Sequence, residues 1–208
     1  MQIAFTVLLI GVLVASVICF VVMGLTQLRR TNSLGRKAHE MRMHFSPGDP
    51  FDVPGRYGTF ALIRSGHGPR AYNVTHGYLG GWPVRAFDFR YEVGHATRRV
   101  GRHYSVIVVE SDLRLPAMVM WHEADSEAAP LSAQAGWAQV SPWICGGDLA
   151  MGRILAGACG PLRDSQVGVE TQGGMVMFHM PVRKRGMDYA ASLEKVERVL
   201  AELKDTLA

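Results

Sequence analysis

The sequence predicts an α+β chain: an N-terminal transmembrane helix, a mostly antiparallel β domain, and a C-terminal amphipathic helix that closes the domain. Three observations predict this order. A long uncharged run occupies residues 3–25, short β-branched and aromatic runs separated by glycines fill residues 58–182, and an apolar stripe with helical spacing fills residues 189–207. Hydrophobic residues make up 48% and charged residues 19% of the 208 positions, which excludes a disordered chain and a polytopic membrane protein.

The run of residues 3–25, IAFTVLLIGVLVASVICFVVMGL, contains no charged residue. At 1.5 Å of rise per residue, about 23 helical residues span roughly 34 Å, enough to cross a hydrocarbon core of roughly 30 Å. A cleavable signal peptide would have a basic start and a shorter apolar core, and a lipoprotein signal would have a small residue where Ile18 precedes Cys19. A buried core helix of this length would rarely lack charge. We therefore expect a permanent anchor that contacts the lipid bilayer through residues 3–25.

The basic residues near the anchor all follow it, which predicts a single-pass protein of the cell membrane with its N-terminus outside and its C-terminal domain in the cytoplasm. Residues 26–50 carry a net charge of +3, whereas residues 51–208 carry +1. A basic residue near an anionic membrane surface contributes about 1 kcal/mol of attraction. The alternative is a topology signal with no further role. The candidate lipid-binding residues are Arg29, Arg30, Arg36 and Lys37.

Composition along the chain divides it into three parts: a transmembrane anchor at residues 1–27, a basic juxtamembrane connector at 28–50, and a soluble α+β domain at 51–208. The cluster Ser-Pro-Gly-Asp-Pro at residues 46–50 marks the boundary. The nearly neutral domain lacks the basic patch of a nucleic-acid-binding protein, so no nucleic-acid partner is expected.

Within the domain, the most regular strand covers residues 83–94, where Phe87, Phe89 and Tyr91 share one face and Asp88 and Arg90 share the other. This alternation predicts an antiparallel strand with one buried and one wet face, and Asp88 could pair across strands with an arginine such as Arg90 or Arg85. Further strands are predicted at residues 58–64, 70–78, 103–111, 117–122, 166–170 and 175–182, a tight turn at Gly80-Gly81, and a short helix near 148–156.

The C-terminal helix begins after Asp188, a good N-cap, and repeats apolar residues every three or four positions. Such a helix must bury its stripe, and the expected receiver is the face with Phe87, Phe89 and Tyr91. The result would be an antiparallel sheet or half-barrel closed by one helix. A pleckstrin-homology-like fold has this outline, an analogy of architecture that carries no function.

Residues 73–94, NVTHGYLGGWPVRAFDFRYEVG, combine an Asn-Val pair, a Gly-Gly turn and a VxxFDFxY strand. This stretch resembles a family of bacterial membrane-anchored proteins in which an Asn-Val motif and a Gly-rich turn precede a VxxFDYxY strand, although Phe89 stands where that family has Tyr. The resemblance implies the same architecture, including a final strand and helix, and implies no catalytic residue.

The histidines and cysteines show no close pair with metal-ligand spacing, so no metal and no cofactor are expected. His67 with His76, or His95 with His103, could still meet across hairpins. Cys145 precedes two glycines and Asp148, which makes it the candidate nucleophile if the chain is an enzyme. The alternatives are buried structural cysteines or a disulfide between Cys145 and Cys159, and no catalytic residue is assigned.

These observations favour a membrane-tethered, non-enzymatic binding or scaffolding domain whose partner is a membrane or cytoplasmic protein. A first alternative is a sensor of anionic lipids or small ligands, and a second is a cysteine-dependent enzyme. The sensor would use one of two basic clusters at predicted turns: Arg98, Arg99 and Arg102, or Arg183, Lys184 and Arg185.

Overall fold

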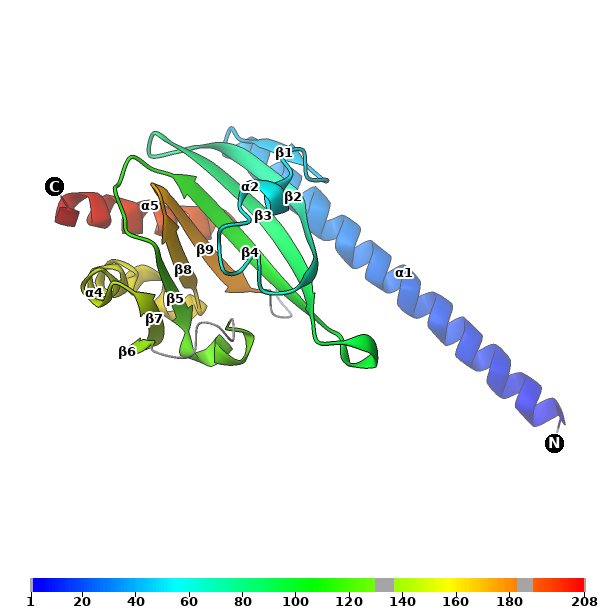
Figure 1. Cartoon of the computed structure of the whole chain (residues 1–208). Helices are drawn as coiled ribbons and strands as arrows, with labels where there is room; N and C mark the ends of the chain where they lie inside the picture. Colours follow the sequence, from blue (N-terminus) through cyan, green and yellow to red (C-terminus); the bar gives the residue numbers. More distant parts are fainter. Residues whose placement is uncertain (1, 130–136, 183–188, 208) are drawn as a thin grey trace.

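The computed structural model describes residues 2–129, 137–182 and 189–207. The fold is α+β, as predicted: an N-terminal apolar helix, an open antiparallel sheet and a C-terminal helix (Figure 1). The helices are α1 (Gln2–Glu40), α2 (Val53–Arg56), α4 (Leu149–Ala158) and α5 (Tyr189–Leu207), with 3₁₀ turns η1 (Ala96–Arg98), η2 (Glu123–Ala128) and η3 (Gly160–Ser165). The strands are β1 (His44–Ser46), β2 (His67–Leu79), β3 (Trp82–Val93), β4 (Val100–Glu110), β5 (Met118–His122), β6 (Ala138–Val140), β7 (Trp143–Gly147), β8 (Gly168–Gln172) and β9 (Met175–Pro181).

The described strands form one nine-stranded sheet in the order β1-β2-β3-β4-β9-β8-β5-β7-β6, and each neighbouring pair is antiparallel. Both edge strands, β1 and β6, are three residues long. The predicted strands at 70–78, 83–94, 103–111 and 117–122 are confirmed as β2 to β5, and the hairpin at 166–182 as β8 and β9. Gly80 and Gly81 make the β2–β3 turn, both with positive φ (57° and 89°), which suits glycine. Asp148 caps α4, accepting hydrogen bonds from Ala150 N and Met151 N.

The helix α1 continues without a break from the apolar run into the domain, and its described large apolar side chains from Ile3 to Leu28 are 48–83% exposed. In contrast, Leu34 and Ala38 on its C-terminal part are buried in the core, and Phe45 of β1 packs beside Gly35. Part of the segment 28–50 therefore packs against the sheet, while the division of the chain at residues 27 and 50 stays a prediction. The cause of this packing is the segment's own apolar spacing, which places a buried stripe against the sheet.

The predicted strand at residues 58–64 is wrong, because these residues form a series of turns. Phe60, Leu62 and Ile63 are buried as a strand would require, but the N–H groups of Ala61 and Leu62 donate to the Glu170 carboxylate, at 2.5 and 2.9 Å. A side chain thus replaces the neighbouring strand as the hydrogen-bond acceptor.

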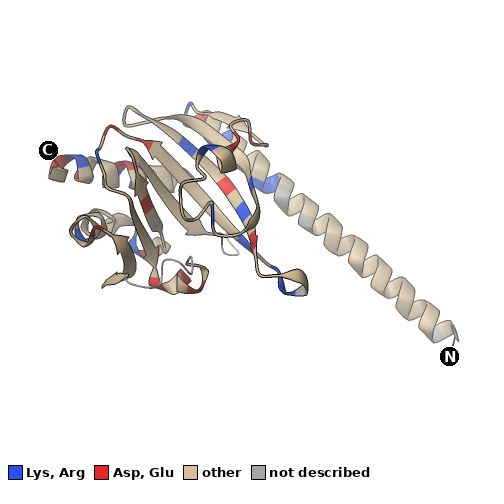
Figure 2. Cartoon of the chain, in the orientation of Figure 1, with Lys and Arg blue, Asp and Glu red and all other residues tan. Residues whose placement is uncertain are grey.

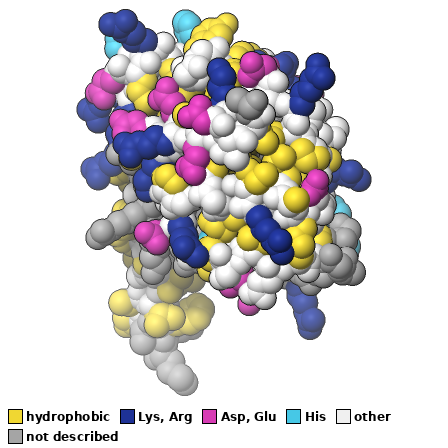
Figure 3. Space-filling model, turned by 90° about the vertical axis from the view of Figure 1, so that its left-hand side faces the viewer, with side chains coloured by type: hydrophobic (Ala, Val, Ile, Leu, Met, Phe, Trp, Pro, Cys, Tyr) yellow, Lys and Arg dark blue, Asp and Glu magenta, His cyan; other side chains and the backbone are white. Residues whose placement is uncertain are grey.

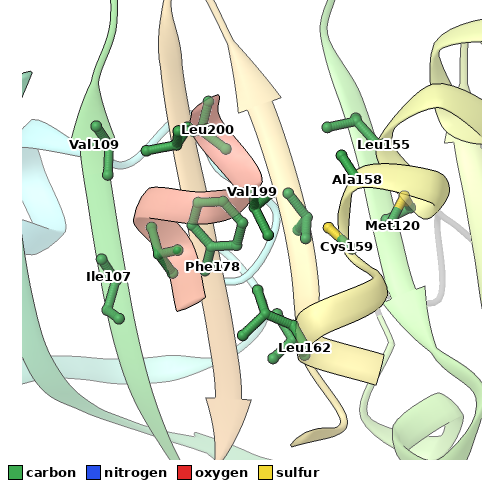
Figure 4. Packing of buried hydrophobic residues seen from close by; sticks show 14 of the residues in the cluster. Ile107, Val109, Met120, Leu155, Ala158, Cys159, Leu162, Phe178, Val199 and Leu200 are labelled. Atoms are coloured by element: carbon green, nitrogen blue, oxygen red, sulfur yellow. The ribbon is translucent and has the colours of Figure 1, made fainter. Parts of the chain in front are cut away.

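The receiver of the C-terminal helix was also predicted wrongly. Apolar residues of α5 pack with Ile107, Val109 and Phe178 on the opposite face of the sheet from Phe87 and Phe89 (Figure 4). The same face receives α4 and η3, through Leu155, Ala158, Cys159 and Leu162 (Figure 4).

The Phe87, Phe89 and Tyr91 face is covered by the irregular segment 51–65. Both faces of β3 are therefore buried at its centre, where even Asp88 is 2% exposed. Asp188, the expected N-cap of α5, lies outside the described residues.

Candidate functional site

Arg30 on α1 and Asp88 on β3 form a two-pronged ion pair at the point where α1 meets the sheet. The Arg30 Nε and Nη2 atoms donate to Asp88 Oδ2 and Oδ1 at 2.9 and 2.6 Å. The side chain of Asp88 is 2% exposed and that of Arg30 is 20% exposed. Arginine is suited to this pairing because its planar guanidinium matches both carboxylate oxygens.

Further polar groups complete this cluster, which we call the Arg30 clamp. Asn73 Nδ2 donates to Asp88 Oδ2 at 2.9 Å, and Ser105 Oγ lies 3.2 Å from Asp88 Oδ1. Thr31 Oγ1 donates to Asn73 Oδ1 at 2.9 Å, so two consecutive residues of α1 contact the network. Asn73 adopts a positive φ of 53°, and its backbone N–H donates to Pro47 O at 2.9 Å. The clamp thereby joins α1, β2, β3 and β4.

The expected pairing of Asp88 with Arg90 or Arg85 is wrong. Its carboxylate contacts Arg30, 58 residues away in the chain, whereas Arg90 lies 3.7 Å from Glu92 and Arg85 pairs with Glu110. Sequence reasoning singled out both Arg30 and Asp88 but did not join them. The only local signal was the acidic residue inside an aromatic strand, which indicates that a basic side chain from another segment pairs with it.

The four candidate lipid-binding residues occupy different environments. Arg29 and Arg36 are exposed, Lys37 is half-buried, and Arg30 faces Asp88. Contact of Arg29, Arg36 and Lys37 with lipid stays a prediction. The structure brings Arg30 into a structural pair inside the domain, and its guanidinium points to the sheet.

A second buried polar pair, missed by sequence reasoning, joins β8 and β9. His179 Nε2 lies 3.7 Å from Glu170 Oε1, both side chains are 2% exposed, and Nε2 has no hydrogen-bond partner in the described part of the chain. Burial raises the pKa of Glu170 to about 7, against the lowering effect of the Leu62 and Ala61 N–H groups. Burial lowers the pKa of His179 to about 3. Both groups are therefore favoured in their neutral forms.

Close packing holds His179 in place. Its ring centroid is 4.4 Å from that of Trp121 and 5.8 Å from that of Tyr104. On β8 the ring lies over Gly168, where any side chain would collide with it. A cleft of about 520 Å³ opens beside Glu170, between residues 59–65 and strands β5, β7 and β8. Because the Glu170 carboxylate already accepts from two backbone N–H groups, its position fits a structural role that ties residues 59–65 to the sheet.

The cysteines lack the environment of a nucleophile. Cys145 and Cys159 are buried and free, so the disulfide alternative is wrong in this structure. Burial raises the pKa of the Cys145 thiol to about 11 and that of Cys159 to about 12, the opposite of what thiolate chemistry needs.

The histidines also pair differently from the two arrangements considered. His44 stacks on His76 with ring centroids 5.1 Å apart, and His67 lies 5.8 Å from His95. Within the described ranges, no group of three or more His, Cys, Asp or Glu side chains could hold a metal ion.

No protein-family model and no curated protein matches the chain. Among solved structures, the chain is similar to the crystal structure of the mycobacterial trehalose monomycolate transport factor A, TtfA, with a TM-score of 0.55 and 15% sequence identity. The match covers 86% of this chain and 93% of the other. At this identity the likeness shows a shared fold and no more.

Proposed function

We propose that the chain is a single-pass membrane protein whose β domain is held in a fixed orientation at the bilayer and acts as a non-enzymatic binding or scaffolding domain. The observation that carries this proposal is the continuity of α1. In the described part of the chain it is the one helix long and apolar enough to cross a membrane, and it extends into the domain core. A tether of this kind raises the effective concentration of the domain for neighbouring membrane proteins.

The clamp gives the tether its stiffness. A flexible linker would let the domain rotate freely, whereas α1 is helical through Glu40 and fixed to three strands by the Arg30 clamp. The surface that the domain presents to a neighbour is then set by the direction in which α1 leaves the sheet. We further propose, from the basic residues after the span, that the domain lies in the cytoplasm.

Cysteine labelling in cells tests the anchor and its orientation. The native Cys145 and Cys159 are buried and report poorly, so we would introduce Ala201→Cys on the exposed side of α5 and Gln2→Cys at the start of α1, each in a Cys19→Ala chain. An impermeant maleimide should label Gln2→Cys in intact cells and Ala201→Cys only after permeabilisation. The reverse pattern would place the domain outside, and release of the chain by alkaline carbonate would contradict the anchor itself.

The enzyme alternative has a separate test. Cys145 is 4% exposed and packs beside Gly152 of α4. In cells that lack the native protein, a Cys145→Ala chain should restore the native phenotype fully. Loss of that phenotype, with the variant folded and present at native level, would favour cysteine chemistry over scaffolding.

A further inference from the structure

The end of the sheet where β3 turns into β4 faces the side from which α1 departs. Gly35 of α1 packs beside Phe45 of β1. Phe45 is in register with Thr75 of β2, which is in register with Ala86 of β3, whereas Arg30 of α1 contacts Asp88 of β3. The direction along α1 toward its N-terminus is therefore the direction along β3 from Ala86 toward Val93. Figure 1 shows this hairpin projecting beyond the sheet toward the side of the apolar helix. If α1 spans a bilayer, this end lies closest to the headgroups.

This end of the sheet is rich in arginine. Arg98 and Arg99 are exposed near the tip, beside Val100, which is 53% exposed (Figure 2). On the strands, Arg70 lies opposite Arg90, and Arg90 lies opposite His103. Like charges opposite each other destabilise a sheet unless an anion or solvent compensates them. Glu92 offsets part of this charge, because its carboxylate lies 3.7 Å from Arg90 and 3.5 Å from Arg99. By contrast, the face visible in Figure 3, away from α1, shows basic and acidic side chains scattered among apolar ones.

A cleft of about 490 Å³ opens at the base of this hairpin, between Val93-Gly94, the start of β2 and η2. Its walls carry Arg64, His67 and Arg102, with Glu127 as the acidic group. Arg102 Nε is buried and has no hydrogen-bond partner among the residues that the structure describes. Neither Arg64 nor Arg102 forms an ion pair with any of those residues. Guanidinium donors without partners in a recess are suited to the oxygens of a phosphate group.

We propose that this cleft binds the phosphate of an anionic phospholipid headgroup, with Arg64 and Arg102 as its ligands and Arg98 and Arg99 contacting neighbouring headgroups. The proposal rests on the proposed function, because only an anchored chain brings the cleft to the membrane surface. A free phosphate ion has the same recognition chemistry. The lipid is favoured because the cleft lies at the bilayer-facing end, next to an exposed tip that carries two arginines and an apolar side chain.

Depth measurement tests the position of the hairpin. The full chain would be reconstituted in nanodiscs of phosphatidylcholine with phosphatidylglycerol, with His95→Cys in a Cys19→Ala background carrying a fluorophore. His95 is exposed at the tip, and Ala201→Cys on α5 is the matched control. A nitroxide on the lipid headgroup should quench the dye at position 95 at least severalfold more than at position 201. Equal quenching at both positions would overturn the proposal.

Ligand titration tests the cleft itself. The detergent-solubilised full chain would be titrated by calorimetry with short-chain phosphatidylglycerol, short-chain phosphatidylcholine and inorganic phosphate. The Arg64→Gln/Arg102→Gln variant should bind the anionic lipid roughly tenfold or more weakly, as expected for lost charged hydrogen bonds. The matched control is Arg114→Gln/Arg163→Gln, which removes the same charge from exposed positions outside the cleft and should bind as the native chain does.

The other outcomes contradict the proposal in distinguishable ways. Equal affinity for inorganic phosphate and the anionic lipid would overturn the lipid assignment, and equal weakening in the control variant would show a general charge effect. Absence of binding to the native chain would overturn the cleft as a site. None of these results would affect the anchor, whose failure would appear separately as release of the chain by carbonate.

Discussion

The two halves of α1 are one helix in two environments. From Ile3 to Leu25 it carries no charge and its described side chains face outward, whereas from Arg30 to Ala38 it contributes an ion pair and buried apolar side chains to the sheet. The first half is recognisable from hydropathy alone. The second half depends on contacts with residues more than 40 positions away. The comparison shows that a helix that begins as an apolar run need not end where that run ends.

The largest expected effect is the loss of the clamp. Replacing Asp88 by Ala leaves the Arg30 guanidinium half-buried without its carboxylate, which should lower the free energy of unfolding by about 3–5 kcal/mol. Chemical denaturation in detergent, followed by tryptophan fluorescence, measures this. The control is Asp205→Ala on the exposed side of α5, which should unfold as the native chain does. A native-like Asp88→Ala chain would mean that the clamp is dispensable.

Replacing one leucine in each half of α1 tests whether only the second half packs against the domain. Leu34→Ala removes a side chain that is 5% exposed in the core, and it should cost about 2–4 kcal/mol of domain stability. Leu13→Ala, at a position that is 63% exposed, should leave domain stability unchanged. The same denaturation experiment measures both variants. Equal losses would imply that the apolar half also packs against the domain.

Titration of the Glu170–His179 pair has the next largest effect. The raised pKa of Glu170 stabilises the fold below its unfolded value of 4.5, a contribution that is lost as pH rises through 7. The lowered pKa of His179 stabilises the fold above 6.5, a contribution that is lost as pH falls toward 3. Their contributions therefore change in opposite directions between pH 5 and pH 8.

Single variants separate these two contributions. Relative to the native chain, Glu170→Gln should gain about 2 kcal/mol of stability on going from about pH 5 to about pH 8, and His179→Asn should lose a similar amount. Denaturation at several pH values measures both differences. Parallel pH dependence in the native chain and both variants would show that neither group changes its pKa on folding.

The smallest effect on stability is expected from a hinge between the two halves. Three glycines inserted between Leu25 and Thr26 interrupt the helix outside the packed region, so the unfolding of the domain should stay close to native. The headgroup quenching at position 95 should fall, because the domain can then turn away from the bilayer. Unchanged quenching would mean that lipid contacts alone, and not α1, orient the domain.

Local patterns predicted β2 to β5, β8 and β9, but not β1, β6 or β7. The alternation from Val84 to Tyr91 and the paired glycines after Leu79 fix β2, β3 and their turn, because period and turn geometry are properties of adjacent residues. Which segment covers each face of the sheet depends on contacts between residues far apart in the sequence. Phe87 and Phe89 were correctly predicted to be buried, but their pattern does not distinguish a helix from the segment 51–65 as the covering layer.

The buried polar contacts escaped prediction for the same reason. Glu170 lies in an apolar run, and its acceptance of the Ala61 and Leu62 N–H groups joins segments more than 100 residues apart. A polar residue within a buried strand signals that a partner exists but not which one. Segment 58–64 has the composition of a strand, but its backbone forms turn hydrogen bonds and donates to the distant Glu170 carboxylate.

The short edge strands have a consequence for the proposed anchoring of the chain in a membrane. Proteins confined to a surface meet one another often and in similar orientations, which favours joining of sheets edge to edge. Here β1 and β6 offer three residues each, and the part of β2 beyond β1 carries register shifts and Arg70. Short, irregular and charged edges are poor templates for a further strand. The domain can therefore be crowded beside its own copies without growing into a continuous sheet.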